Sequence, residues 1–291
     1  MAVMLQSRET RPPAGWSLTA DDSSAGATLR LWERPGPHPG APRIALVHGF
    51  EENWDSWLPL AAHLWSGLHL YALELPWRAG SAHTWGHHGS PAAWLERALT
   101  GLPVPPDAVV AHSFGATTLL ESLALRSAAA SVPAVLVAPV YRPHDDPADP
   151  AFYAEALARF RRVLADGMRV QIGPRAATLP EDLLDIMARK IRERVEPQGF
   201  LQFYAQLVRT AALDPGRVDV PVLFIGGTGD QAAPPAAVDE LRARMTDLRV
   251  HQSPDLTHFC QTEQSQEVAA RIDGFLAGLG QAPTELEAIG A

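Results

Sequence analysis

Cysteine and lysine are almost absent from this 291-residue sequence, which contains one of each, Cys260 and Lys190. A single cysteine excludes a disulfide within the chain. The first fifteen residues lack the apolar segment of a secretory signal, and no apolar run is long enough to span a membrane. We therefore expect a cytoplasmic protein that does not contact a membrane.

Basic tails are also missing, and the formal net charge is −9. This balance offers no basic surface to a nucleic acid, so we expect no nucleic-acid partner. Histidine pairs with the spacing of zinc ligands are absent, since His87 and His88 are adjacent, and we expect no metal. A hydrophobic fraction of 46% is typical of a globular chain with a sizeable core.

Short apolar runs alternate along the chain with segments of helical periodicity. The runs predicted to be strands are 27–33, 44–47, 68–75, 108–112, 133–140, 220–226 and 248–252. Strands separated by helices favour an α/β fold with a mostly parallel central sheet flanked by helices. Residues 1–26 are rich in turn formers, and we expect a loose lead-in there.

The alternation is interrupted between 141 and 214, where no buried strand is visible and the apolar residues recur at helical spacing. We predict that this segment is an inserted helical cap. The core of the fold would then comprise residues 1–140 and 215–291.

The most informative motif is Ala111-His112-Ser113-Phe114-Gly115, which lies between an apolar run and a helical segment. A serine in a sharp strand-to-helix turn, flanked by small residues, is typical of an exposed nucleophile. The alternative is a polar turn in which Ser113 only caps the following helix.

A serine hydroxyl needs a base, an acid that orients the base, and donors for the oxyanion. Asp230 and His258 each follow a downstream predicted strand, where the carboxyl ends of parallel strands meet. Taken singly, Asp230 could be a residue of a glycine turn and His258 a surface histidine. Their order after Ser113 favours a catalytic triad.

The sequence His48-Gly49-Phe50 follows another buried run. A glycine there lets the backbone turn its amides towards the site, so we expect the amides of Phe50 and Phe114 to form the oxyanion hole. We assign His48 a structural role in this loop and His112 at most a role in shaping the turn.

These motifs, together with Trp57, resemble those of the α/β-hydrolase superfamily over residues 27–280. The resemblance implies an α/β-hydrolase fold, a helical cap between the sixth and seventh strands, and no cofactor or metal. A serine at position 113 argues against epoxide hydrolases and haloalkane dehalogenases, which use aspartate there.

Aromatic side chains near the expected site predict a fairly large, apolar acyl pocket. The candidate substrate contacts are Trp77, Trp85, Phe152, Phe160, Phe200 and Tyr204. Trp77 and Trp85 could instead pack in the core. The basic run 189–194 is expected to be solvated, or else to receive an acidic acyl carrier protein.

The sequence therefore predicts a serine hydrolase that cleaves a carboxylic ester or thioester of a small-molecule substrate with an apolar acyl group. One alternative keeps the triad in a thioesterase, acyltransferase or cyclase that acts on a carrier-bound acyl chain in natural-product assembly. A second is hydrolysis of a C–C bond next to a ketone. The non-enzyme alternative is a protein of this fold that only binds a ligand.

Overall fold

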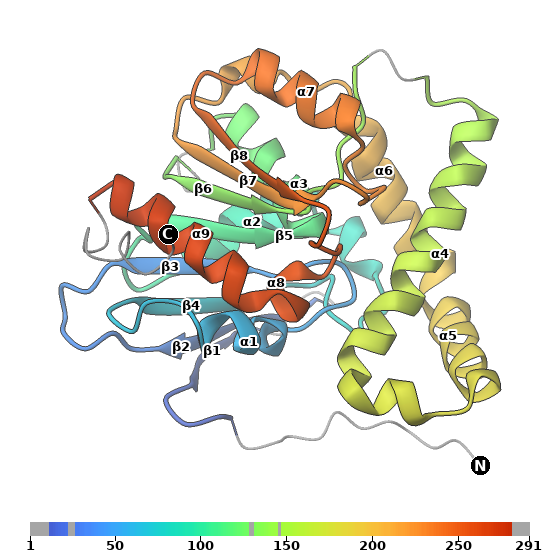
Figure 1. Ribbon diagram of the computed structural model, residues 1–291, viewed down its shortest axis with the longest axis horizontal. Coiled ribbons are helices and arrows are strands. Elements are labelled where there is room, and N and C mark those ends of the chain that lie inside the picture. Colours follow the sequence, from blue (N-terminus) through green and yellow to red (C-terminus); the bar gives the residue numbers. More distant parts are fainter. Residues whose placement is uncertain (1–11, 23–26, 128–130, 145–146, 281–291) are drawn as a thin grey trace.

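A single sheet of eight strands forms the centre of the protein in the computed structural model, which describes residues 12–22, 27–127, 131–144 and 147–280 (Figure 1). Its order is β1-β2-β4-β3-β5-β6-β7-β8. The strands are β1 (Ser17–Asp22), β2 (Leu29–Arg34), β3 (Arg43–Val47), β4 (His69–Glu74), β5 (Ala108–His112), β6 (Ala134–Val137), β7 (Val222–Gly227) and β8 (Leu248–Ser253). β2 is antiparallel to β1 and β4, and every pair from β4 to β8 is parallel. The predicted α/β fold with a mostly parallel sheet is confirmed.

Helices cover both faces of this sheet, which is why its central strands are apolar on both sides. In β5, Val109 and Ala111 pack on one face, whereas Ala108 and Val110 pack on the other. The first face carries α2 (Pro91–Thr100), α3 (Ser113–Ala124) and α7 (Pro235–Arg244). The second carries α1 (Leu58–Ala61), α8 (Cys260–Glu263) and α9 (Ser265–Gly278).

Strand β1 corrects the expectation of a loose lead-in over residues 1–26. It pairs with β2 at the edge of the sheet, and all six of its residues are exposed. A strand that contributes nothing to the core carries no apolar pattern, so only its backbone pairing reveals it. Residues 1–11 and 23–26 of the expected lead-in lie outside the described residues, as do residues 281–291.

Three helices lie between β6 and β7, inside the range predicted for the helical cap: α4 (Pro150–Ile172), α5 (Glu181–Val195) and α6 (Leu201–Thr210). We call these helices and their connections the helical insertion. It stands beside the carboxyl ends of the parallel strands, on the right of Figure 1. The Asp149 side chain caps α4 by accepting a hydrogen bond from the Phe152 amide, and Pro150 occupies the first turn. No helix in the described ranges is long and apolar enough to cross a membrane.

Candidate active site

Ser113 lies in the tight turn between β5 and α3, with a φ of +48°. Non-glycine residues seldom adopt such a conformation, and it is typical of strained functional sites. Gly115 makes the turn possible, because a Cβ there would lie 2.5 Å from the His48 carbonyl oxygen and 2.8 Å from that of Val47. Gly115 therefore lets the first turn of α3 approach the end of β3 closely, which places Ser113 at the carboxyl end of the sheet.

The three residues of the predicted triad lie within hydrogen-bonding distance of one another. His258 Nε2 is 2.9 Å from Ser113 Oγ, and His258 Nδ1 is 2.8 Å from Asp230 Oδ2. Asp230 follows β7, and its second carboxylate oxygen accepts a hydrogen bond from the Ala232 amide at 2.9 Å. His258 follows β8, so the three side chains come from the carboxyl ends of β5, β7 and β8, which are parallel strands of one sheet.

Electrostatics favour the ionisation states that a base and its orienting acid require. Burial alone would raise the pKa of Asp230, but the charge and hydrogen bond of His258 and the Ala232 amide outweigh it and lower that pKa. Burial also tends to lower the pKa of His258, but Asp230 outweighs it and raises that pKa. With Nδ1 donating to Asp230, the neutral imidazole presents an unprotonated Nε2 to Ser113.

The two amides predicted for the oxyanion hole belong to the loop after β3 and to the first turn of α3. The Phe114 amide has no partner within the helix, since the first amides of a helix never do. Neither does the Phe50 amide donate a hydrogen bond within the described part of the chain. The loop is fixed on either side of Phe50, where the Glu51 amide donates to the Trp77 carbonyl at 2.9 Å. Both amides are therefore available to a developing oxyanion.

His48 holds this loop, as its expected structural role requires. Its Nε2 accepts a hydrogen bond from the Leu75 amide at 2.9 Å, and its Nδ1 donates to the Gly49 carbonyl at 2.7 Å. Burial lowers the pKa of His48 to about 4. The ring is therefore neutral at physiological pH and is not available as a base.

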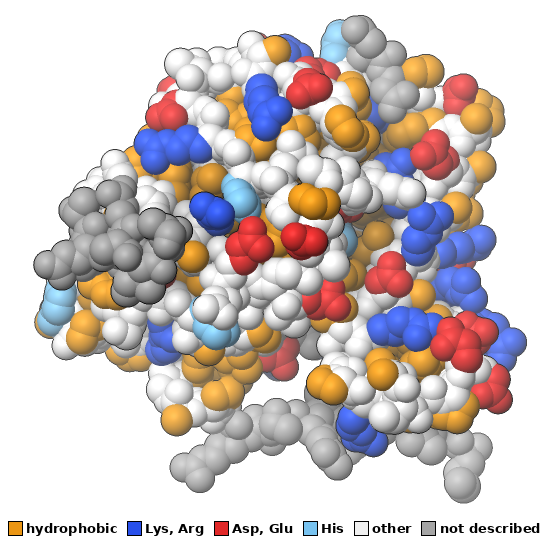
Figure 2. Space-filling view, in the orientation of Figure 1, with side chains coloured by type: hydrophobic (Ala, Val, Ile, Leu, Met, Phe, Trp, Pro, Cys, Tyr) orange, Lys and Arg blue, Asp and Glu red, His pale blue; other side chains and the backbone are white. Residues whose placement is uncertain are grey.

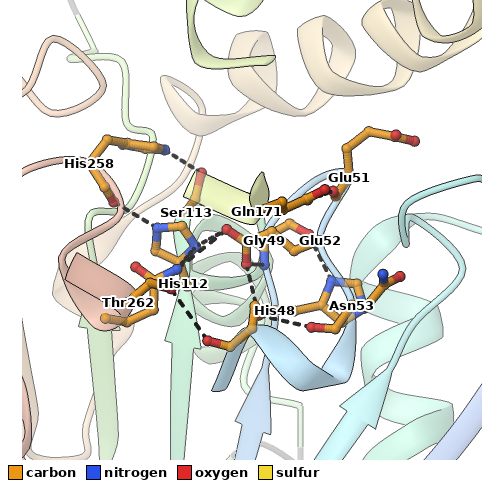
Figure 3. Close-up of polar contacts among 12 residues, drawn as sticks. His48, Gly49, Glu51, Glu52, Asn53, His112, Ser113, Gln171, His258 and Thr262 are labelled. Carbon is orange, nitrogen blue, oxygen red and sulfur yellow. Dashed lines mark hydrogen bonds and ion pairs between the residues drawn. The ribbon is translucent and has the colours of Figure 1, made fainter. Parts of the chain in front are cut away.

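Glu52 forms a buried ion pair with His112, which sequence reasoning missed (Figure 3). The Glu52 carboxylate is 2.9 Å from His112 Nδ1 and also accepts hydrogen bonds from the Gly49 amide, at 2.8 Å, and from Gln261 Nε2, at 3.3 Å. Burial raises the pKa of Glu52, but His112 and the Gly49 amide outweigh it and lower that pKa to about 2. His112 Nε2 donates in turn to the His258 carbonyl oxygen at 2.8 Å.

A second buried ionic cluster joins the loop after β3 to the helical insertion. The Glu51 carboxylate contacts His83 Nε2 at 2.6 Å and pairs with the Arg194 guanidinium, and the Gln171 amide donates to the Glu51 carbonyl at 3.0 Å. The last arginine of the basic run 189–194 is thus paired with the loop after β3, although its side chain is 39% exposed. Figure 2 shows basic and acidic side chains intermingled over the insertion, where Arg161 pairs with Glu196 and Arg169 with Glu181.

A cavity of about 30 Å³ lies directly beside Ser113. Its walls are mostly apolar, as predicted, but it is much smaller than the large acyl pocket that the sequence suggested. The side chains that line it include Phe50, Val140, Phe160, Leu164, Phe203 and Phe259. The rings of Phe50, Phe160 and Phe203 contact one another edge to face or at a tilt and form part of the cavity wall.

The aromatic residues predicted in the insertion divide into two groups. Phe160 lines the cavity, whereas Phe152, Phe200 and Tyr204 pack in the insertion's own apolar cluster and do not line it. Phe203, which was not among the predicted contacts, lines the cavity. Phe203 and Tyr204 of α6 lie three and four residues after Phe200, so helical spacing does not show which of them faces Ser113.

Trp77 and Trp85 are fully buried in the core and do not line the cavity beside Ser113. Both rings lie edge-on to Phe114, with ring centroids 5.3 Å and 6.2 Å away. The geometry supports the packing alternative for both residues and gives no contact with a substrate. They stabilise the residue whose amide is a candidate donor to the oxyanion.

Other reactive groups near the site are less suited to attack a carbonyl. Burial raises the pKa of the Cys260 thiol to about 12, so it is protonated at neutral pH. Among the residues that the structure describes, no group of three His, Cys, Asp or Glu side chains could hold a metal ion. Ser113 is therefore the candidate nucleophile.

Comparison with known protein families matches residues 44–271 to the alpha/beta hydrolase family. No curated protein sequence matches the chain. Residues 44–271 include Ser113, Asp230 and His258.

Solved structures of similar fold come from several kinds of hydrolase. A membrane phospholipase A, described as a novel bacterial virulence factor, is 19% identical with a TM-score of 0.70 over 92% of this chain and 88% of that chain. Naproxen esterase from Bacillus subtilis is 18% identical, with a TM-score of 0.59 over 91% and 92%. The thioesterase domain from the curacin biosynthetic pathway is 18% identical, with a TM-score of 0.55 over 88% and 99%. At these identities the matches show a shared fold.

Proposed function

Since the chain belongs to the alpha/beta hydrolase family and is a hydrolytic enzyme, we propose that it is a serine hydrolase that cleaves carboxylic esters or thioesters of apolar acyl groups. The observation that carries the proposal is the hydrogen-bonded series from Ser113 through His258 to Asp230. The apolar cavity beside Ser113 supports an apolar acyl group.

In the first half of the reaction, Ser113 Oγ attacks the carbonyl carbon while His258 Nε2 takes its proton. The amides of Phe50 and Phe114 stabilise the resulting oxyanion, and each such donor lowers the barrier by about 3 kcal/mol. His258 then gives the proton to the leaving oxygen or sulfur. The C–O or C–S bond breaks, and the acyl group stays on Ser113.

In the second half, His258 takes a proton from water as the water oxygen attacks the acyl carbon. The bond between that carbon and Ser113 Oγ then breaks, His258 returns the proton to Oγ, and the acid is released. Asp230 keeps Nδ1 protonated and stabilises the imidazolium that forms in both halves. Each step needs only the described side chains and water.

Turnover of p-nitrophenyl acetate and butyrate tests the proposal. We expect Ser113→Ala to lower kcat by at least about 1,000-fold, because the nucleophile is lost. The matched control is Ser122→Ala, which removes a buried serine from the same helix, away from the cavity. Equal turnover by Ser113→Ala and the parent protein would contradict the assignment.

A further inference from the structure

Two spaces of very different size meet at His258. One is the apolar cavity of about 30 Å³ beside Ser113. The other, which we call the outer groove, has a volume of about 770 Å³ and lies between residues 166–177 of the insertion and residues 257–263. His258 lines both spaces, whereas Ser113 lines only the cavity.

The chemistry of acyl transfer assigns each space to one part of the substrate. His258 Nε2 takes the proton of Ser113 Oγ and gives it to the leaving atom, which is bonded to the same carbonyl carbon, so Nε2 must reach both atoms. The acyl group stays next to Ser113. The leaving atom therefore departs beside Nε2, and the rest of a bulky leaving group extends past His258 into the outer groove, which His258 also lines.

The cavity beside Ser113 limits the length of the acyl group. An apolar protein cavity of about 150 Å³ holds a benzene molecule. On the same scale, a volume of about 30 Å³ takes only about one or two carbon atoms. Because the packed rings of Phe50, Phe160 and Phe203 form part of its wall, a long chain would have to displace them.

The outer groove is large, and its charged residues disfavour an anion. Polar side chains along it include Asp166, Arg169, Thr262 and Glu263. The Arg169 guanidinium is paired with Glu181, so the acidic charges of Asp166 and Glu263 predominate. A smaller groove of about 350 Å³, lined by Arg159 and Arg162 among others, also reaches His258 and is where an anionic leaving group would be better placed.

We propose that the substrate joins a short apolar acyl group to a bulky, polar leaving group without anionic charge, and that this leaving group binds in the outer groove. The inference rests on the proposed function of Ser113. In the reaction, the C–O or C–S bond to this alcohol or thiol breaks, and the proton of Ser113 passes through His258 to the departing atom.

A matrix of thioesters tests the two halves of the proposal separately. The acyl groups are acetyl, butyryl and decanoyl, each joined to propanethiol, to N-acetylcysteamine or to coenzyme A, and the released thiol is measured. We expect kcat/KM for butyryl to exceed that for decanoyl at least tenfold. We expect N-acetylcysteamine to exceed propanethiol at least fivefold, because its polar arm reaches the groove, and coenzyme A, with its phosphates, to give no further gain.

Two alanine-to-tryptophan variants locate the leaving group. Ala177→Trp places a large ring in the outer groove and is expected to abolish the preference for N-acetylcysteamine over propanethiol. The control, Ala158→Trp, alters an exposed alanine of α4 that lines neither groove and should keep the preference. Both alanines are exposed, so neither variant disturbs the core.

Two other variants test the acyl side. Phe203→Leu enlarges the cavity beside Ser113, and we expect it to raise the decanoyl-to-butyryl ratio several-fold. Tyr204→Leu, its neighbour on α6, does not line the cavity and should leave the ratio unchanged.

Any of three outcomes would overturn the inference. The first is a rise in kcat/KM from butyryl to decanoyl thioesters, and the second is a preference for N-acetylcysteamine over propanethiol that survives in Ala177→Trp. The third is a marked preference for coenzyme A thioesters, which would point to the groove beside Arg159 and Arg162. Failure of the proposed function looks different. In that case no thioester or ester is turned over and Ser113 does not react with a fluorophosphonate. If the fluorophosphonate labels Ser113 but kcat/KM does not differ among the thioesters, only the inference is contradicted.

Discussion

The Glu52 carboxylate and the His112 imidazole lie 2.9 Å apart, both buried, directly beneath the candidate catalytic residues. Through this pair, the loop that carries the Phe50 amide is joined to the residue before Ser113 and to the backbone of His258. The Glu52–His112 pair therefore connects three segments that are distant in the sequence: the loop after β3, the end of β5 and the loop that carries His258. The geometry of the triad depends on Glu52 as well as on Asp230.

Replacing this charge is expected to change the pH profile of the enzyme. Burial lowers the pKa of His258, while Asp230 and, to a lesser extent, Glu52 raise it. Glu52→Gln removes one negative charge that favours the imidazolium, so the pKa of His258 falls. Because the base must be neutral, the acidic limb of the kcat/KM profile moves to lower pH. We also expect kcat to fall about tenfold, or about 1.4 kcal/mol, as the backbone of His258 loses its support.

The control for this prediction is Glu121→Gln, which removes a buried glutamate of α3 that pairs with Arg209. Glu121→Gln should lower the free energy of unfolding and leave the acidic limb of the kcat/KM profile at the same pH. An acidic limb that does not move in Glu52→Gln would show that the Glu52 charge does not act on His258.

The turn at Ser113 should tolerate no side chain at position 115. A Cβ there would overlap the carbonyl oxygens of Val47 and His48, which belong to the backbone and cannot rotate away. We expect Gly115→Ala to lower the free energy of unfolding by about 2–3 kcal/mol and to reduce kcat sharply. Urea unfolding and esterase assays measure the two effects.

Gly274→Ala is the matched control, because a Cβ at this position of α9 meets nothing within 4 Å. Alanine in a helix should raise stability there by about 0.5–1 kcal/mol. If Gly115→Ala behaved like Gly274→Ala, the close approach of α3 to β3 would not be a constraint.

The Glu51–Arg194 pair should hold the helical insertion against the loop after β3. Arg194→Met leaves the buried Glu51 carboxylate with one partner fewer, which we expect to cost about 1–3 kcal/mol of unfolding free energy. Burial raises the pKa of Glu51, but His83 and Arg194 outweigh it, so the folded protein holds that pKa below its usual value. The stability this provides is present above the unfolded pKa of about 4.3 and is lost as the pH falls. The difference between variant and parent should therefore narrow below pH 4.

Urea unfolding at pH 7 and at pH 3 measures this difference in unfolding free energy. Arg189→Met is the control, because Arg189 is largely exposed and lies 4.0 Å from its partner Glu193. Such surface pairs contribute less than about 1 kcal/mol. The role of Arg194 would be contradicted if Arg194→Met and Arg189→Met lowered the free energy of unfolding equally. It would also be contradicted if the effect of Arg194→Met did not change with pH.

The fold, and the meeting of Ser113, Asp230 and His258, were predictable from the sequence because they follow from strand burial and sheet topology. Strands such as β3 and β5 are covered on both faces, and only continuous apolar runs satisfy that environment. Parallel strands bring their carboxyl ends to one edge, so residues after successive strands are predicted to meet. Ser113, Asp230 and His258 do meet there.

Contacts between residues that are distant in the sequence could not be predicted from these patterns. Glu52 lies in the sequence Glu51-Glu52-Asn53, which looks like a solvated turn, and only the fold places His112 against it. Likewise, the size of the cavity depends on how α4 and α6 pack over Ser113, which periodicity does not determine. The apolar character of the cavity was predictable, but its small volume was not.

Reaction with a fluorophosphonate probe, followed by intact-protein and peptide mass spectrometry, tests the central claim most directly. A serine activated by His258 should form one covalent adduct at Ser113, which Ser113→Ala abolishes and Ser122→Ala retains. An unlabelled parent protein, or an adduct that persists in Ser113→Ala, would show that Ser113 is not the nucleophile.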